Sequence, residues 1–231
     1  MRVLAIESSS PQGSVALLES GRLVVSLTHD EPNAHAERLL PLVEQALAEA
    51  GWSRATIERM GVGIGPGSFT GVRVGIALAQ GLALGLGRPL VGVTSLAAMA
   101  RAVPREVAGM RVPLLDARRE EVFRAAYLPD GSVHTPPHTV AREVAARGGE
   151  SAGPLVWVGS VAEELGLTSV HRASDSDLPH ASWVGRIAAE AATWDLAVEP
   201  LYVREADAVK PREAPDALAG ELREPGELHR S

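Results

Sequence analysis

The expected order of strands and helices occurs twice along the chain, and this repetition limits the possible folds more than any other feature. In the first half, three runs of β-branched and aliphatic residues are separated by turns rich in Gly, Pro and Ser, and strands and helices then alternate. A weaker version of this order begins after the loop at 104–110. The pattern predicts an α/β fold made of two related halves of the βββαβα type. The expected strands are 3–8, 14–19, 23–28, 60–65, 90–93, 112–116, 121–127, a weak one near Val133 and 155–158. The first expected helix carries the apolar stripe 39–50 and starts late or kinks at Pro41. The other expected helices are 68–86, a helix capped by Thr94 or Ser95, 140–147 and 181–194.

These patterns divide the chain into three segments. Residues 1–105 form an N-terminal half, residues 106–204 form a degenerate C-terminal half, and residues 205–231 form a tail. The tail holds mixed charges and three prolines but almost no large apolar residue, which is the composition of a solvated segment. We therefore expect the tail to be flexible and to lie outside the fold.

Composition restricts the class of protein. With 231 residues, of which 45% are hydrophobic, the chain can fill a core of its own. The formal net charge of -7 argues against a protein that grips nucleic acid alone, because phosphate binding depends on clustered Lys and Arg. The absence of Cys excludes disulfides and thiolate sites. Glu7 comes too early for a signal peptide, and no apolar run looks long enough to span a bilayer, so we expect a soluble cytoplasmic protein with no membrane contact.

Two carboxylates, Glu7 and Asp116, stand at matched places, each at the end of the first strand of its half. In nucleotide-binding folds built from two such halves, facing carboxylates hold a hydrated magnesium ion and glycine turns cradle the phosphates. The first turn, which includes Ser9, can still offer hydroxyls, whereas the second, at 117–119, has no glycine. A local structural role is the better interpretation for Asp116. Glu7, Ser9 and Asp116 are candidates only for a vestigial cofactor site.

The segment 61–73 reads Gly-Val-Gly-Ile-Gly-Pro-Gly-Ser-Phe-Thr-Gly-Val-Arg and predicts a strand, a tight turn and the start of a helix. It matches neither the Walker spacing nor the dinucleotide-binding spacing. A phosphate site is therefore the minority interpretation, and Ser68 as the N-cap of the following helix is the better one.

The helix after this turn contains four glycines, each of which costs about 1 kcal/mol relative to Ala. A smooth ridge of small residues at i, i+4 spacing lets another backbone approach closely, which would offset that cost. The sequence leaves two partners open, either this chain's own helix at 35–50 or sheet, or a helix of another subunit. The ridge is Gly67, Gly71, Gly75, Ala79 and Ala83.

The histidines provide a test for a metal site. His134 and His138 have the i, i+4 spacing of a helical pair, but Pro136-Pro137 between them forbids a helix, so we expect a loop. His35 stands at the start of the first helix, and Leu39 occupies the position one turn later where a second ligand would be needed. The sequence therefore predicts neither a metal site nor a catalytic residue.

Five motifs carry a resemblance to a known family. The most specific is the string at 65–75, Gly-Pro-Gly-Ser-Phe-Thr-Gly-Val-Arg-Val-Gly, and the segments 5–9, 35–41, 116–123 and 200–204 support it. Over residues 1 to about 206 the chain resembles the TsaB (YeaZ) family of the bacterial tRNA threonylcarbamoyladenosine machinery. The family usually has Asp where this chain has Glu7, and this difference weakens any residual nucleotide role.

The resemblance implies an actin-like fold in which two ribonuclease-H-like halves pack around a cleft, without a cofactor. TsaB-like proteins look like degenerate paralogues of TsaD, which binds metal through two helical histidines and transfers threonylcarbamoyl to the adenosine beside the anticodon, in tRNAs that read codons starting with A. The chain would then be a non-catalytic scaffold and activator that pairs with TsaD, works with TsaE and meets tRNA only through the complex. A homodimer through the same surface is expected when TsaD is absent. The implied interface on the first two helices comprises His35, Leu39, Val43, Gly67, Phe69, Gly71, Arg73, Gly75, Leu78, Ala79 and Leu82.

Two other functions stay open on the sequence alone. Glu7 and Asp116 motivate a nucleotide-dependent kinase or ATPase of the actin-like superfamily. A metallopeptidase is the third possibility, because the family also resembles proteins called glycoproteases.

Overall fold

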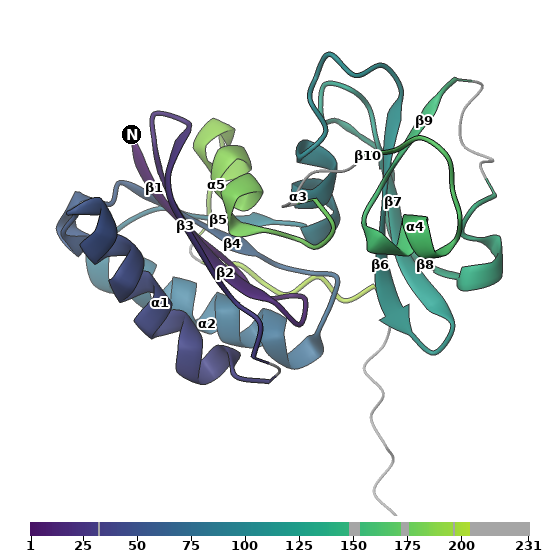
Figure 1. Ribbon diagram of the computed structural model, residues 1–231. Coiled ribbons are helices and arrows are strands. Elements are labelled where there is room, and N and C mark those ends of the chain that lie inside the picture. Colours follow the sequence, from purple (N-terminus) through teal and green to yellow (C-terminus); the bar gives the residue numbers. More distant parts are fainter. Residues whose placement is uncertain (32, 148–152, 172–175, 196, 204–231) are drawn as a thin grey trace, which may run out of the picture.

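The computed structural model consists of two lobes, each built on a five-stranded sheet (Figure 1). It describes residues 1–31, 33–147, 153–171, 176–195 and 197–203, so the expected tail at 205–231 lies outside the described residues. The strand order is β3-β2-β1-β4-β5 in one sheet and β8-β7-β6-β9-β10 in the other, with matching parallel and antiparallel pairs. The expected duplication and the α/β class are confirmed.

The first sheet places the first strand of the chain at its centre. This strand pairs antiparallel with β2 and parallel with β4, and its burial on both faces explains why its sequence is almost continuously apolar. The register sets Glu7 opposite Ser14 and Ile6 opposite Val62, so the end of β1 lies beside the start of β2 and the end of β4. The strands are β1 (Arg2–Glu7), β2 (Gly13–Glu19), β3 (Arg22–His29), β4 (Arg59–Gly63) and β5 (Leu90–Val93).

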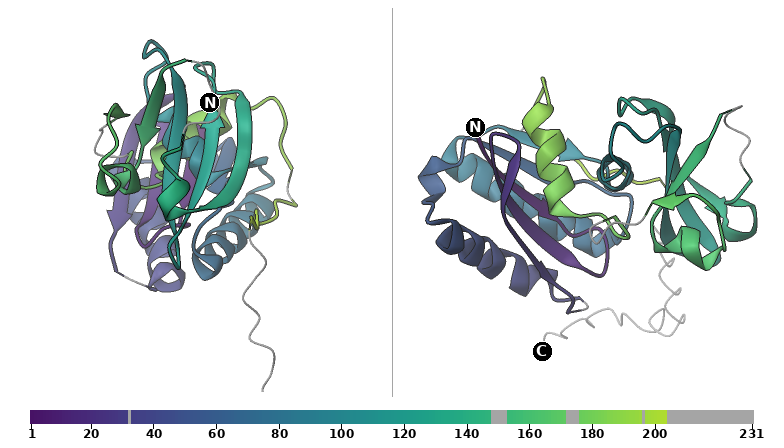
Figure 2. Two further views of the ribbon diagram at one scale, coloured as in Figure 1. Left: turned by 90° about the vertical axis from the view of Figure 1, so that its right-hand side faces the viewer. Right: turned by 45° about the horizontal axis from the view of Figure 1, so that its top comes forward.

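Helices cover both faces of the first sheet (Figure 2). Leu4 and Ile6 of β1 share a core cluster with α1 and α2, whereas Val3 and Ala5 point to the other face and pack with α5. Because α5 follows all the strands of the second lobe, the first lobe is not one continuous segment. The domain division at 105/106 stays a prediction. The helices are α1 (His35–Ala50), α2 (Phe69–Leu86), α3 (Ser95–Arg101), α4 (Ser160–Glu164) and α5 (Ala181–Glu190), with short 3₁₀ turns η1 (Arg54–Thr56) and η2 (Arg142–Val144).

The second sheet lies beyond α3, which stands between the two lobes (Figure 1). Leu115 of the central strand β6 packs in a cluster with α3, and Leu114 points to the opposite face, where it clusters with Val161 of α4. The two faces of β6 are therefore covered by different helices. The strands are β6 (Met110–Arg118), β7 (Glu121–Tyr127), β8 (Val133–Ala141), β9 (Leu155–Val158) and β10 (Val170–His171).

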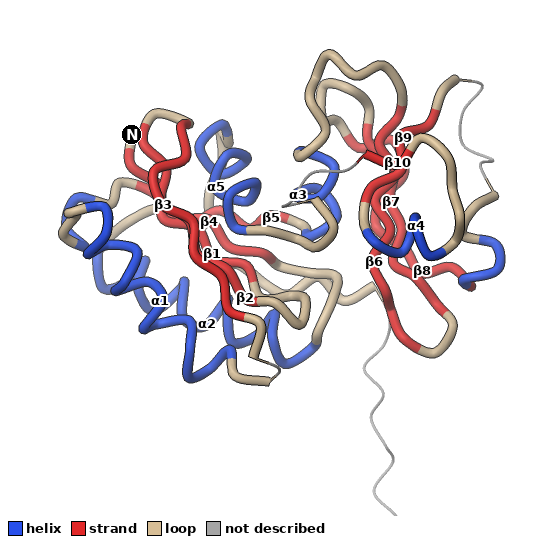
Figure 3. Tube along the Cα trace, in the orientation of Figure 1, coloured by secondary structure: helices blue, strands red, loops and turns tan. Residues whose placement is uncertain are grey.

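Strand β8 corrects two expectations. It runs the whole length of 133–141, so the segment holding His134 and His138 is a strand and not a loop, and 140–147 is not a helix but the strand end followed by η2 (Figure 3). Pro136-Pro137 fits this strand because β8 lies at the edge of its sheet, where a missing backbone N–H breaks no ladder on the open side.

Smaller differences concern the helices. The first helix begins at His35, ahead of Pro41, so it does not start late. The last helix ends at Glu190, four residues before the expected end. The short elements α4 and β10 were not expected, since neither is long enough to show a period in the sequence.

Helix α2 also bears on the membrane question. Among the described residues it is the one helix long and apolar enough to cross a bilayer by length and composition, contrary to the expectation that no such run exists. A core helix of a globular protein meets the same criterion, and one side of α2 is buried against the sheet and α1.

Candidate functional site

Glu7 is fully buried at the end of β1. The backbone N–H of Ser9 donates to its Oε1 at 2.6 Å, and its Oε2 is buried without a hydrogen-bond partner. Burial raises the pKa of this carboxyl, against the lowering effect of the hydrogen bonds from Ser9 and Ser8. The carboxyl fills the space that a side chain at Gly63 would occupy. A carboxyl enclosed in this way is not open to a ligand.

The turn after β1 is used to hold other elements. The Ser8 hydroxyl donates to the carbonyl of Gly71 at 2.9 Å, and the Ser95 hydroxyl donates to the hydroxyl of Ser9 at 2.7 Å. The backbone N–H of Ser68 also donates to the carbonyl of Ser9, at 2.6 Å. The serines that the sequence suggested for a phosphate site instead connect the start of α2 and the start of α3 to the sheet through hydrogen bonds.

Asp116 does not face Glu7. By the alternation of a strand, Asp116 shares the face of Val112 and Leu114, which α4 covers, whereas Glu7 shares the face of the first sheet that α5 covers. Asp116 is exposed, its Oδ1 accepts from the backbone N–H of Arg118 at 3.2 Å, and it pairs with Arg142 at 3.6 Å. The two carboxylates therefore do not face each other, and the local role expected for Asp116 agrees with these contacts.

The first helix offers one histidine, and its surroundings are structural. His35 is buried, its Nε2 lies 3.0 Å from the carbonyl of Ser10, and its Nδ1 lies 3.1 Å from Nε2 of His29. Burial, followed by the effect of His35, lowers the pKa of His29. Leu39 is fully buried in the core. Within the described part of the chain, no group of three or more His, Asp or Glu side chains is arranged to hold a metal ion. The sequence gives no sign of the contact between His35 and His29, because it joins a helix start to a strand end.

The inner side of α2 packs against its own chain. Ser68 caps the helix by accepting from the N–H of Gly71 at 3.2 Å, as expected. A Cβ at Gly71 would overlap the carbonyl oxygen of Ser8, and one at Gly75 would overlap the Ser8 hydroxyl. Gly67 approaches Ser9 in the same way. The glycine ridge therefore has an internal partner, the turn after β1.

The glycines on the outer side of α2 have no such partner among the described residues. A Cβ built at Gly81 or at Gly85 meets no atom within 4 Å. Leu84 is 74% exposed, and Ala77 lies on the same open side. We call the exposed and partly exposed residues of this side the outer face of α2: Phe69, Thr70, Arg73, Val74, Ala77, Leu78, Gly81, Leu82, Leu84 and Gly85.

An aromatic cluster stands at the first turn of the outer face. The Arg73 guanidinium lies 3.5 Å from the ring centre of Phe69, and its Nε donates to the hydroxyl of Tyr202 at 2.7 Å. The two rings lie 5.4 Å apart. Tyr202 arrives from the far end of the chain, so the C-terminal segment helps to order this edge of the face.

These positions correct the expected interface. The structure buries part of it inside the chain, because α1 and the glycine ridge face the first sheet. The buried or internally packed members are His35, Leu39, Val43, Gly67, Gly71, Gly75 and Ala79. Phe69 and Arg73 are exposed, and Leu78 and Leu82 are partly exposed. For these four residues the interface stays a prediction.

The sequence is similar to proteins of a known family. The sequence model of the family "TsaD: tRNA N6-adenosine threonylcarbamoyltransferase" matches residues 30–136. The "tRNA threonylcarbamoyladenosine biosynthesis protein TsaB" of Escherichia coli is 44% identical over 133 residues, which cover 56% of each chain. A Mycobacterium tuberculosis protein is 35% identical over 209 residues, covering 89% of this chain and 93% of that protein.

A solved structure extends the likeness to the whole fold. The structure "YeaZ from Pseudomonas aeruginosa" superposes with a TM-score of 0.73 at 31% sequence identity, covering 87% of this chain and 99% of that one. By sequence, the chain spans about half the length of the curated TsaB relatives it matches.

Proposed function

The chain belongs to the TsaB (YeaZ) family of actin-like fold, and from that premise we propose that it is a non-catalytic scaffold and activator in tRNA threonylcarbamoyladenosine formation. Its partner in this proposal is TsaD, with TsaE as a further component. The reaction is the transfer of threonylcarbamoyl from an adenylate, with release of AMP, to the adenosine beside the anticodon, in tRNAs that read codons starting with A. We place this role in the cytoplasm.

One observation carries the proposal: around Gly81 and Gly85 the outer face of α2 is small and apolar, and no described atom lies within 4 Å of a Cβ built at either glycine. Gly81 and Gly85 cost the helix about 1 kcal/mol each relative to Ala, and no internal contact requires them. A second helix that packs here can approach closely because these positions carry no side chain. Leu84 and Phe69 add large apolar surface on either side.

The proposed partner fits the relationship between the two families. The TsaD sequence model matches residues 30–136, a range that contains both α1 and α2. A protein with related helices can present a similar small-residue face, so that two such helix pairs meet as a bundle. The same reasoning supports a homodimer of this chain when TsaD is absent.

The enclosed carboxyl supports a non-catalytic role. Glu7 has no open side from which a magnesium ion or a phosphate could reach it, and Asp116 lies on a face that does not meet it. Leu39 fills the core where the related transferase would need a second histidine. We therefore propose that TsaD supplies the chemistry and that this chain contacts tRNA only through the complex.

Reconstitution tests the proposal. The purified chain is combined with TsaD and TsaE of the same organism, ATP, threonylcarbamoyl adenylate as the donor and an unmodified tRNA, and modified nucleosides are measured by mass spectrometry. We expect co-elution with TsaD in gel filtration, modification only when the chain is present, and none from the chain alone. Independent elution together with full modification in its absence would contradict the proposal. Tight binding of Mg-ATP to the chain alone, measured by calorimetry, would support the kinase alternative instead.

A further inference from the structure

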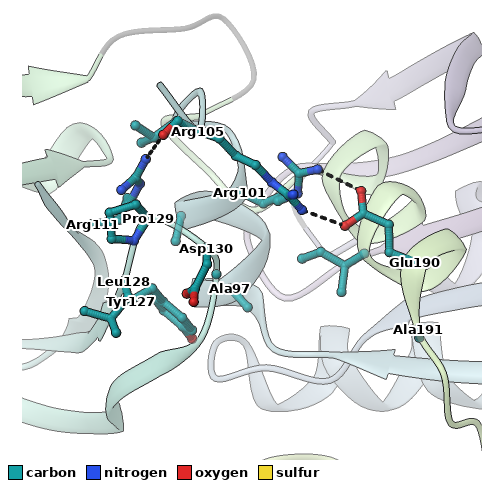
Figure 4. Close-up of a pocket in the computed structure, with 14 residues that line it drawn as sticks. Ala97, Arg101, Arg105, Arg111, Tyr127, Leu128, Pro129, Asp130, Glu190 and Ala191 are labelled. Carbon is teal, nitrogen blue, oxygen red and sulfur yellow. Dashed lines mark hydrogen bonds and ion pairs between the residues drawn. The ribbon is translucent and has the colours of Figure 1, made fainter. Parts of the chain in front are cut away.

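A cavity lies between the two lobes, away from both the outer face of α2 and the turn after β1 (Figure 4). It has a volume of about 280 Å³ and is lined by α3 and the end of α5 on one side, and by β6, β7 and the turn at 128–131 on the other. Arg111 and Tyr127 are paired at the start of β6 and the end of β7, whereas Asp116 lies near the opposite end of β6. The cavity is therefore distinct from the vestigial nucleotide position.

The charges around the cavity do not balance. Glu190 is shared between two arginines, with Oε1 2.8 Å from Arg101 and Oε2 3.2 Å from Arg105 (Figure 4). Asp130 is exposed at the rim, where its Oδ1 accepts from the backbone N–H and the hydroxyl of Ser132. With Arg111, the lining holds three arginines in total and two carboxylates, which leaves one net positive charge.

Arg111 is the arginine of the cavity that forms no direct ion pair, and the charge of Asp130 acts on it from a longer distance. Only 2% of the residue is exposed, and its Nη atoms donate to the carbonyls of Gly109, Pro104 and Val107 at 2.6 to 2.9 Å. Among the described residues no carboxylate lies within ion-pair distance of it. Burial lowers the pKa of this guanidinium, which is the sign of a cation that has lost hydration.

A second arginine has an unsatisfied donor. The Nε of Arg101 is buried and has no hydrogen-bond partner in the structure. A buried donor without a partner is costly, and an anion that enters the cavity would satisfy this donor and would bring a negative charge closer to Arg111. The remaining lining is aliphatic, from Ala97, Ala100, Val103, Leu128 and Ile187.

We propose that this cavity binds a small organic oxyanion, namely a carboxylate or phosphate group on a short aliphatic body. The oxyanion would lie beside Arg111 and Arg101, and the aliphatic part against α3 and α5. The volume is near the lower end of the range of small-molecule sites, about 300 to 1,000 Å³, so the ligand is smaller than a nucleotide. Because both lobes line the cavity, a bound ligand would also fix the lobes relative to each other. This proposal is independent of the proposed function.

Calorimetry and thermal unfolding with three probes that share an isobutyl group test the charge requirement. The probes are isovalerate, the neutral isovaleramide and isobutyl phosphate. We expect at least one of the two anions to bind at millimolar concentration and to raise the melting temperature, and the amide to bind at least tenfold more weakly. The anion that binds more tightly identifies the preferred group. Equal binding of the amide, or no binding of any probe, would overturn the proposal.

Two variants locate the binding. Ala97→Leu fills the cavity and should weaken anion binding at least tenfold, while Ala48→Leu on the exposed side of α1 should leave it unchanged. Glu190→Gln removes the carboxylate that competes for Arg101 and Arg105, so it should tighten anion binding several-fold. The gain in affinity of Glu190→Gln can be measured even if the Ala97→Leu variant does not fold. Unchanged affinity in Glu190→Gln, or in folded Ala97→Leu, would place the anion elsewhere.

Discussion

The two sides of α2 carry similar small residues, yet the structure gives them different roles. On the inner side, Gly71 and Gly75 touch Ser8, and a side chain at either position would overlap it. On the outer side, Gly81 and Gly85 face open space in the described structure. The inner glycines are required by the monomer. The outer glycines lower helix stability, and no contact inside the described chain requires them. The difference shows that only the outer side is free to serve another subunit.

Substitution of an inner glycine should have the largest effect on stability. In Gly71→Ala the new Cβ overlaps the carbonyl oxygen of Ser8, a backbone atom that cannot move without shifting the turn after β1. We expect a loss of about 2 to 3 kcal/mol in the free energy of unfolding, measured by urea denaturation. The matched control, Gly85→Ala, should gain about 0.5 to 1 kcal/mol. Equal effects of the two substitutions would remove the distinction between the sides.

Substitution of an outer glycine should act on assembly and not on the monomer. Gly81→Leu adds a side chain where a partner helix would approach, so self-association measured by sedimentation velocity should weaken at least about tenfold, or 1.4 kcal/mol. Monomer stability should be unchanged or higher, because Leu favours helix over Gly. An unchanged dimerisation constant would show that the dimer uses another surface.

The enclosed carboxyl behind the inner side predicts a pH dependence. Burial raises the folded-state pKa of Glu7 above its ordinary value of 4.5. The contribution of Glu7 to folding stability is therefore fully present below pH 4.5 and is lost as the pH rises through the folded-state pKa. Stability of the native sequence should therefore fall with rising pH in this window, and Glu7→Gln should not show this fall. Urea denaturation of both proteins across the window gives the comparison. Parallel pH profiles would mean that Glu7 is more accessible than the structure shows.

The smallest effect is expected at the first turn of the outer face. Tyr202→Phe removes the hydroxyl that accepts from Arg73 but keeps the ring beside Phe69. Because the group is exposed, the monomer should lose about 0.5 kcal/mol or less. Thermal unfolding measures this change, and a loss of several degrees would show that the C-terminal segment holds α2 more firmly than its contacts suggest.

Much of the fold could be predicted from periodicity, and the main exception depends on a strand's position in its sheet. The strands at 90–93, 121–127 and 155–158 were predicted with their observed limits, because turn residues bound them on both sides. Strand β8 was not, since Pro136-Pro137 is allowed only at a sheet edge, and edge position is a tertiary property.

The candidate site was harder to predict for a similar reason. Spacing placed Gly67, Gly71 and Gly75 on one ridge but could not say what touches it, because Ser8 and Ser9 lie about sixty residues earlier. The relation between Glu7 and Asp116 depended on which face of each strand meets which helix, and the sequence contains no sign of that.

The absence of Cys from the chain permits a direct test of the docking face. A single thiol is introduced in Ala77→Cys, on the outer face of α2, and in the control Val133→Cys, which is exposed on β8. Maleimide labelling rates are then measured with and without TsaD. The docking proposal predicts that TsaD slows labelling of Ala77→Cys at least about tenfold and leaves Val133→Cys unchanged. Unchanged labelling of Ala77→Cys in a complex that co-elutes with TsaD would contradict it.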